Sequence, residues 1–166
     1  MYLYDELSGA RFSSCMTYRY YLWRWWDKSR PSANFLMLNP STADEVDDDP
    51  TVSRCGKRAA NLGFGGVVVT NIFALRSRDP SKLYVTDDPI GPENDEAILE
   101  AAHQAGIVIC AWGQHGAFVQ RATKVTQMLT AAGIDLHCLR LNKDGSPAHP
   151  LYVPLAIVPR RFCGEE

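Results

Sequence analysis

The chain has 166 residues, of which 46% are hydrophobic and 22% charged. This is an ordinary balance for one globular domain with one core. Its net charge of -2 argues against a protein that coats nucleic acid by bulk electrostatic attraction. No apolar run approaches membrane-spanning length, and residues 1–11 lack the basic and then apolar order of a secretory signal. We therefore expect a single cytoplasmic domain over residues 1–166, with no membrane partner.

The five cysteines are dispersed along the chain and form no Cys-x-x-Cys pair. An odd, scattered set is typical of reduced thiols that serve as small buried side chains. Zinc or iron–sulfur sites need clustered thiolates, so we expect no metal and no cofactor. The cysteines are Cys15, Cys55, Cys110, Cys138 and Cys163.

The first thirty residues are rich in strand formers. Residues 16–26 are mostly aromatic, and Arg19 and Arg24 interrupt their apolar face. This pattern predicts an antiparallel hairpin over residues 1–30, with Phe12 on its first arm. Such aromatic runs stack on nucleobases in some proteins, but more often they cover one side of a core.

From residue 34 onward, short apolar runs alternate with helical segments that end at glycines. Fully apolar runs are typical of strands buried on both faces, and the alternation predicts right-handed βαβ units over residues 34–158. We expect an α/β fold, a three-layer α/β/α sandwich with a central, mostly parallel four-stranded sheet and the hairpin at one flank. The expected strands are residues 34–38, 67–73, 107–112 and 134–141, and the expected helices are residues 50–62, 93–104 and 117–132.

Three further segments lie between or after these elements. Residues 76–89 and 142–150 are predicted loops, because Asp-Pro pairs and a glycine break them, and a short element follows at residues 151–158. Residues 44–49 form an acidic loop with two alternative interpretations. Its carboxylates would hold a divalent cation, or Asp49 would cap a helix that Pro50 opens. The spacing lacks the glycine and the glutamate of a calcium loop, which favours the cap.

Polar side chains follow each predicted strand. In open parallel sheets ligands bind outside the carboxyl ends of the strands, so these groups should meet at one edge. Each of them alone has a simpler interpretation as a turn, a strand end or a solvated loop residue. The groups are Asn39, Ser41, Thr42, Asn71, Arg76, Trp112, Lys143 and His149.

Several motifs resemble a bacterial and phage family defined only as a domain of unknown function (domain of unknown function 1643). Its signature is Leu-Asn-Pro-Ser-Thr-Ala-Asp, found here at residues 38–44. Nearly the whole chain carries matching motifs, and the resemblance names no activity. The other motifs are Asp-Pro-Thr at residues 49–51, Gly-Pro-Glu-Asn-Asp at 91–95, Ala-Trp-Gly at 111–113 and His-Pro-Leu-Tyr at 149–152.

The order of the strand-end motifs is also similar to the uracil-DNA glycosylase superfamily. Asn39-Pro40 resembles the first motif of its mismatch-type members, and His149-Pro150 resembles the final motif. Between them stand Asn71, where part of the superfamily reads the base edge, and Trp112 before a glycine. Ser41 and Leu151 differ from the glycine and the phosphate-binding serine common at those places.

This second resemblance implies an enzyme that hydrolyses the N-glycosidic bond of a uracil or modified base in DNA, without a cofactor. Asn39 would orient a water and His149 would donate a hydrogen bond to the departing base, so these two are the catalytic candidates. Asn71 would pair with the base edge and Phe73 would stack on it. The remaining substrate-binding candidates are Pro40, Ser41, Thr42, Asp44, Arg76, Trp112, Lys143 and Leu151.

Two alternatives remain open from the residues. The acidic net charge favours an enzyme acting on free nucleosides or nucleotides, because a small ligand needs only a local basic site. The same crevice would also serve a non-catalytic module that binds nucleobases or nucleic acid. The expected partner is DNA or another ligand that contains a nucleobase, and the oligomeric state is left open.

Overall fold

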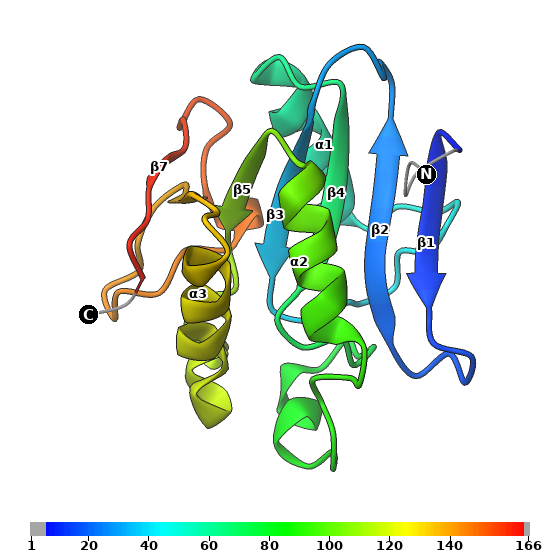
Figure 1. The fold of residues 1–166 in the computed structure, drawn as a ribbon, viewed down its shortest axis with the longest axis vertical. Coiled ribbons are helices and arrows are strands. Elements are labelled where there is room, and N and C mark those ends of the chain that lie inside the picture. The colour runs from blue at the N-terminus through cyan, green and yellow to red at the C-terminus, as the bar shows by residue number, and fades with distance from the viewer. Residues whose placement is uncertain (1–5, 165–166) are drawn as a thin grey trace.

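Seven strands form one mixed sheet in the computed structural model, which describes residues 6–164 (Figure 1). In chain order they are β1 (Ser8–Phe12), β2 (Arg19–Trp25), β3 (Ser32–Met37), β4 (Gly66–Asn71), β5 (Ile107–Cys110), β6 (Leu136–Cys138) and β7 (Arg160–Arg161). Across the sheet the order is β1-β2-β4-β3-β5-β6-β7.

The predicted α/β class is confirmed, but the sheet is larger than the four strands expected. Strands β4, β3, β5 and β6 are parallel to one another. The hairpin of β1 and β2 is antiparallel and lies at one flank as expected, and it also extends the sheet, because β2 pairs antiparallel with β4, with Tyr21 opposite Thr70. The two-residue strand β7 extends the other edge. A hydrophobic pattern indicates that a strand is buried but does not indicate which strand it pairs with. The sequence therefore did not predict that the hairpin and β7 extend the sheet.

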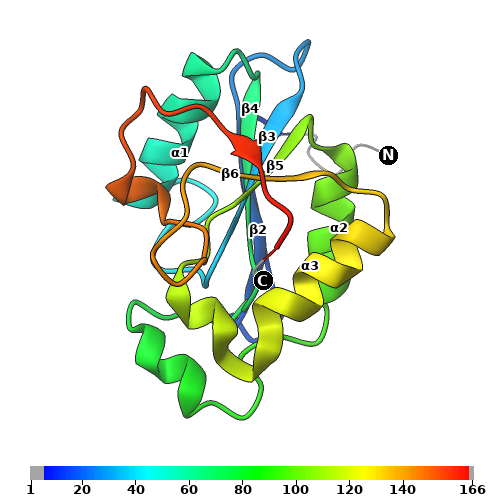
Figure 2. The ribbon, with the colours of Figure 1, turned by 90° about the vertical axis from the view of Figure 1, so that its left-hand side faces the viewer.

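Helices cover both faces of the sheet (Figure 2). Helix α1 (Pro50–Asn61) packs on one face, and α2 (Asn94–Gln104) and α3 (Arg121–Ala131) pack on the other. Alternate side chains of the central strands fill the two cores, as in Phe35 on the side of α1 and Leu36 on the side of α2 and α3. The sheet therefore separates two apolar layers, which explains why β3 and β4 are buried at every position.

Several loop and helix boundaries differ from the expected ones. The helix expected at 117–132 begins only at Arg121, because Val119 and Gln120 have positive φ angles of 47° and 57°. A 3₁₀ segment, η2 (Gln114–Gln120), precedes it. The strand expected at 134–141 shortens to β6, and the regions 76–89 and 151–158 contain the 3₁₀ turns η1 (Pro80–Tyr84) and η3 (Pro150–Tyr152).

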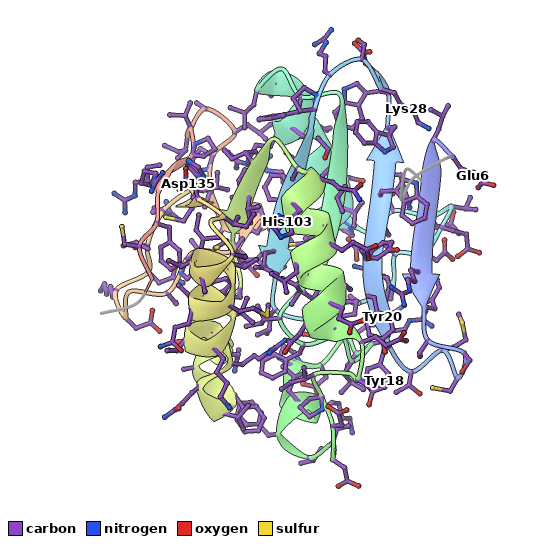
Figure 3. All side chains as sticks on the ribbon, in the orientation of Figure 1. Glu6, Tyr18, Tyr20, Lys28, His103 and Asp135 are labelled. Carbon is purple, nitrogen blue, oxygen red and sulfur yellow. The ribbon has the colours of Figure 1, made fainter. Side chains whose placement is uncertain are left out.

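The aromatic side chains of the hairpin pack against the protein itself. Tyr20 is fully buried, and its ring stacks on that of Tyr18 with 6.3 Å between centroids. Figure 3 labels both tyrosines near the lower end of α2. The Tyr18 hydroxyl donates to the carbonyl of Asp88 over 2.7 Å, which joins the hairpin to the loop before α2. These two rings therefore serve as core residues and not as a platform for bases.

The cysteines of the structure are free thiols. Cys55, Cys110 and Cys138 are buried in the two cores, whereas Cys15 and Cys163 are exposed. Burial raises the pKa of the Cys110 thiol well above its ordinary value, so this group stays protonated and apolar. Within residues 6–164, no helix has the length and apolar character needed to cross a membrane.

Side chains of α2 and α3 hold the carboxyl end of β4. The Asn94 amide, fully buried, donates to the carbonyls of Asn71 at 2.8 Å and Ile72 at 3.2 Å. The Arg121 guanidinium donates to the same Ile72 carbonyl at 2.7 Å and to the Asp95 carboxylate at 2.6 Å. The Gly-Pro-Glu-Asn-Asp motif thus acts on the backbone of a neighbouring strand.

Replacing Asn94 with alanine should lower the free energy of unfolding by about 1–3 kcal/mol, because two buried carbonyls lose a donor. Urea denaturation of wild type and Asn94→Ala measures the difference. The matched control is Asn61→Ala at the exposed end of α1, which should change stability by no more than about 0.5 kcal/mol. Equal effects of the two substitutions would contradict the role of Asn94 in holding β4.

Candidate functional site

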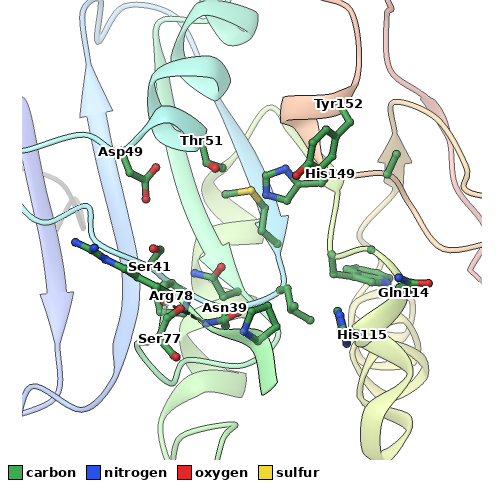
Figure 4. Close-up of a pocket in the computed structure, with 18 of the residues that line it drawn as sticks. Asn39, Ser41, Asp49, Thr51, Ser77, Arg78, Gln114, His115, His149 and Tyr152 are labelled. Carbon is green, nitrogen blue, oxygen red and sulfur yellow. Dashed lines mark hydrogen bonds between the residues drawn. The ribbon is translucent and has the colours of Figure 1, made fainter. Parts of the chain in front are cut away.

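A cavity of about 740 Å³ lies at the carboxyl ends of the parallel strands (Figure 4). The chain leaves β3 toward α1 on one face, whereas it leaves the neighbouring strands β4 and β5 toward α2 and α3 on the other. The loops diverge there and open a crevice, which is the usual ligand site of such sheets. The predicted site residues that line this cavity are Asn39, Pro40, Ser41, Asn71, Trp112, Lys143 and His149.

Asn39 joins the loops that follow two neighbouring strands. Its amide nitrogen lies 2.8 Å from the carbonyl oxygen of Ser77, 3.2 Å from that of Pro40 and 3.4 Å from that of Leu75. Three carbonyls around one atom require the amino group there, because an oxygen would repel them. The acceptor Oδ1 is the atom of the amide that remains for a ligand or a water.

Asn71 is the least satisfied polar side chain of the cavity. It ends β4, beside Met37 of β3, and only 1% of its surface is exposed. Neither its Nδ2 nor its Oδ1 has a hydrogen-bond partner. A buried amide without partners costs about 1–3 kcal/mol, so it is rare in a folded protein. Its donor and acceptor are therefore both uncommitted within the protein, at a residue that lines the cavity.

His149 is held as a neutral imidazole. Burial lowers its pKa from the ordinary value, with Asp49 opposing the shift. Its Nδ1 accepts the backbone N–H of Leu151 over 3.3 Å, so the neutral ring carries its proton on Nε2. Figure 4 shows His149 beside Tyr152, across the cavity from Ser41 and Asp49. The ring therefore offers a hydrogen-bond donor without a positive charge.

Backbone contacts close the wall that follows β5. Gly113 has a φ of 72°, which lets the chain turn sharply after Trp112. The Gly113 N–H donates to the carbonyl of Pro147 over 2.9 Å and so connects β5 to the loop at 142–150. In that loop the Asp144 carboxylate accepts from the N–H and the hydroxyl of Ser146, and these bonds lower its pKa.

Charged side chains of both signs line the cavity. Arg19, Arg78 and Lys143 are the cations, and Asp49 and Asp144 are the acids. Both acids are engaged within the protein: Asp49 accepts the Val52 N–H as the cap of α1 at 2.9 Å, and Asp144 closes its turn. The cap interpretation of Asp49 is therefore confirmed, and within residues 6–164 no cluster of metal-ligating side chains is present.

Phe73 does not line the cavity. Its side chain is fully buried in the core beneath α3, where its ring lies 6.1 Å from that of Phe118. This corrects the prediction that Phe73 stacks on a base. The strand was expected to run to residue 73, but β4 ends at Asn71 and the next two residues turn into the core.

Four further predicted site residues also lie outside the cavity lining. The Arg76 guanidinium lies 4.6 Å from the centre of the Phe12 ring and donates to the Met16 carbonyl. The Asp44 carboxylate accepts two backbone N–H groups of its own turn. Thr42 and Leu151 are exposed. The structure therefore does not bring these four side chains together with Asn39.

Further lining residues were not among the predicted catalytic or substrate-binding candidates, and they include Arg19, Ser77, Arg78, Gln114 and His115. Gln114 and His115 directly follow the expected strand end at Trp112, so their position in the sequence indicated this edge of the sheet. Arg19 is a charged residue inside an otherwise aromatic strand. The sequence pattern assigns that strand to a flank, so nothing connected it with the strand ends. The structure brings it there through the pairing of β2 with β4.

Replacing Asn39 with aspartate should lower stability by about 1–3 kcal/mol, because a carboxylate would face three carbonyls that now receive donors. Urea denaturation at neutral pH measures the change. Gln127→Glu makes the same atomic exchange on the exposed face of α3 and should stay within about 0.5 kcal/mol of wild type. An Asn39→Asp protein as stable as wild type would show that the amide does not hold these loops.

The lowered pKa of His149 predicts a pH dependence of stability. The unfolded chain binds a proton near pH 6.5, whereas the folded protein resists it to lower pH, so stability is lost as pH falls from about 6.5 through the folded pKa. Urea denaturation between pH 7.5 and 5 should show a shallower decline for His149→Gln than for wild type. His103→Gln, on the exposed side of α2 (Figure 3), should keep the wild-type slope. Parallel profiles of all three proteins would refute the prediction.

Comparison with known proteins identifies the family. The model of the family described as "Protein of unknown function (DUF1643)" matches residues 19–151. Neither the curated proteins nor the solved structures compared with the chain gave a match. The matched residues run from β2 to the end of the loop that carries His149, so they include all but Tyr152 of the cavity lining. The chain therefore belongs to the DUF1643 family.

Proposed function

We propose that the cavity binds a nucleobase and that the protein hydrolyses the N-glycosidic bond of a uracil or modified base in DNA. The single observation that carries the proposal is the unpaired, buried amide of Asn71 in the same cavity as Asn39 and His149. An amide presents a donor and an acceptor side by side, which is the pattern that a base edge complements. The order of the strand-end motifs supports the same assignment.

Cleavage of an N-glycosidic bond leaves an electron-poor sugar and an anionic base, so it needs a placed water and a donor to the base. The free acceptor Oδ1 of Asn39 would orient the water, because the amino group of this amide is already bound to carbonyls. An amide is not a general base, so the reaction would be slower than with a carboxylate. The neutral Nε2–H of His149 would stabilise the charge on the departing base.

The cavity also offers an aromatic group in place of the buried Phe73. Tyr152 lines the cavity with 75% of its surface exposed, and its ring centre lies 5.7 Å from that of His149. An exposed ring at a cavity rim can stack on a base with little rearrangement. We assign the stacking role to Tyr152.

The acidic net charge favours free nucleosides or nucleotides as a second class of substrate, since the protein lacks the overall positive charge of many DNA-binding proteins. The chemistry at the cavity would be the same in both cases. Only the size of the molecule that carries the base differs.

The direct test incubates the protein with single-stranded and duplex oligonucleotides, and with free nucleosides, that carry uracil or modified bases. Release of a free base is the expected product, and Asn39→Ala and His149→Ala should each lower its rate by about 10²-fold or more. Release from free nucleosides alone would assign the second class of substrate. No release from any substrate at high protein concentration would refute hydrolysis.

Asn71 allows stability and function to be separated. Asn71→Leu removes an unpaired buried amide at nearly constant volume, so it should leave the free energy of unfolding unchanged or raise it, while base release is lost. The control Asn94→Leu removes a buried amide that is hydrogen-bonded and should lower stability. A destabilised Asn71→Leu protein would indicate that this amide has a structural partner.

A further inference from the structure

Arg19 is a buried cation that has no ion-pair partner among residues 6–164. Only 2% of its surface is exposed, and it lines the cavity from β2. One of its terminal nitrogens donates to the Ala43 carbonyl over 2.9 Å, and its Nε has no hydrogen-bond partner. Among residues 6–164 no carboxylate lies within ion-pair distance of it.

The other two buried arginines are much better satisfied. Arg121 makes an ion pair with Asp95 over 2.6 Å and also donates to a carbonyl. Arg58 donates from both terminal nitrogens to three carbonyls of the loop after η3, although its Nε is unpaired. Each of these two therefore holds elements of the fold together, and neither lines the cavity. Arg19 has a single bond of this kind, so its burial beside the cavity is not explained by a structural role.

The charges around Arg19 leave room for an anion. Burial lowers the pKa of Arg19 to about 10, with Asp49 opposing the shift, so the group is charged at neutral pH. Asp49 is the acidic residue whose charge acts on Arg19, and its carboxylate also accepts the Val52 N–H at the start of α1. Two further cations, Arg78 and Lys143, line the same cavity, together with the hydroxyl groups of Ser41 and Thr51.

We propose that Arg19 binds a phosphate group of the ligand, so that the cavity takes a phosphorylated nucleotide unit and not a free base or nucleoside. A guanidinium presents its donors in a fork that matches two phosphate oxygens, and burial strengthens such a pair. The inference rests on the proposed function for the base, which Asn71 would read in the same cavity. The phosphate would belong either to a mononucleotide or to the backbone of a DNA strand.

The test compares the affinities of matched ligands for the whole protein by titration calorimetry. The probes are the four deoxynucleosides and deoxyuridine, their 5′-monophosphates, inorganic phosphate, and a short single-stranded oligonucleotide. At least one monophosphate should bind wild type about tenfold or more tightly than its nucleoside, as expected for a charge-assisted pair. In Arg19→Met this ratio should fall to about one.

Arg161→Met is the matched control, because Arg161 is an exposed arginine on β7 that pairs with Asp135 outside the cavity. It should keep the wild-type ratio. Arg19→Met should still fold, since an apolar side chain of similar length replaces an unpaired buried charge. If it does not fold, Arg78→Met, which changes an exposed residue of the lining, should lower the same ratio, and an unchanged ratio would then count against the phosphate site.

The outcomes separate the two proposals. Equal binding of nucleosides and monophosphates would overturn the phosphate site and leave the base site standing. Binding of inorganic phosphate that Arg19→Met abolishes, with no effect of any base, would support the phosphate site and refute base recognition. No binding of any phosphate-containing probe would overturn the phosphate site. Tighter binding of the oligonucleotide than of the monophosphates would identify a DNA strand as the source of the phosphate.

Discussion

The arrangement of the cavity depends on one amino group, that of the Asn39 side chain. It donates to carbonyls of two different loops, one after β3 and one after β4, and the Ser77 N–H completes the connection by donating to Pro40. These loops leave neighbouring parallel strands toward opposite faces, and the backbone pairing of the two segments extends only to the bonds from the Ile72 and Phe73 N–H groups to the carbonyls of Met37 and Leu38. Beyond that point Asn39 connects the two loops. Asn39 of the Asn-Pro motif therefore holds the loops together, in addition to the role proposed for its Oδ1 in orienting a water.

A second set of contacts acts from the opposite face of the sheet. Asn94 and Arg121 bind the carbonyls at the end of β4 from the side of α2 and α3, whereas the side chain of Asn71 faces the cavity. The carbonyls of Asn71 and Ile72 accept hydrogen bonds, whereas the side-chain amide of Asn71 has no partner. Rigid support behind an unsatisfied group is the arrangement expected of a preorganised binding site.

Much of this arrangement could be predicted from the sequence, because apolar runs and glycine-terminated helices identify parallel strands, and parallel strands collect their carboxyl ends at one edge. That reasoning predicted Asn39, Asn71, Trp112 and His149 together, and the cavity contains all four. The prediction for Phe73 was wrong because hydrogen bonding of the backbone determines where a strand ends, whereas the apolar run in the sequence continues past that point into the core.

Arg19 could not be predicted as part of the cavity, for a different physical reason. An aromatic hairpin has no signal that selects its neighbour in a sheet, since pairing partners are chosen by packing of the assembled faces. Only the antiparallel pairing of β2 with β4 brings the guanidinium to the strand ends. The start of α3 was missed similarly, because left-handed φ angles at Val119 and Gln120 are not encoded by their residue types.

Asn71 and Arg19 are buried polar groups that lower the stability of the ligand-free protein. The Asn71 amide has no hydrogen-bond partner, and the Arg19 guanidinium has no ion-pair partner among residues 6–164. Both side chains are almost fully buried, and both line the same cavity. Asn94 and Arg121 are better satisfied, because the Asn94 amino group donates to two carbonyls and Arg121 makes an ion pair, although Oδ1 of Asn94 also has no partner. A polar group that is desolvated in the free protein loses little more on binding, so most of the energy of its new hydrogen bonds contributes to affinity. A ligand that hydrogen-bonds both groups should therefore stabilise the fold in proportion to its affinity. A ligand that bonds only one of them leaves the other group unsatisfied and its unfavourable free energy unchanged.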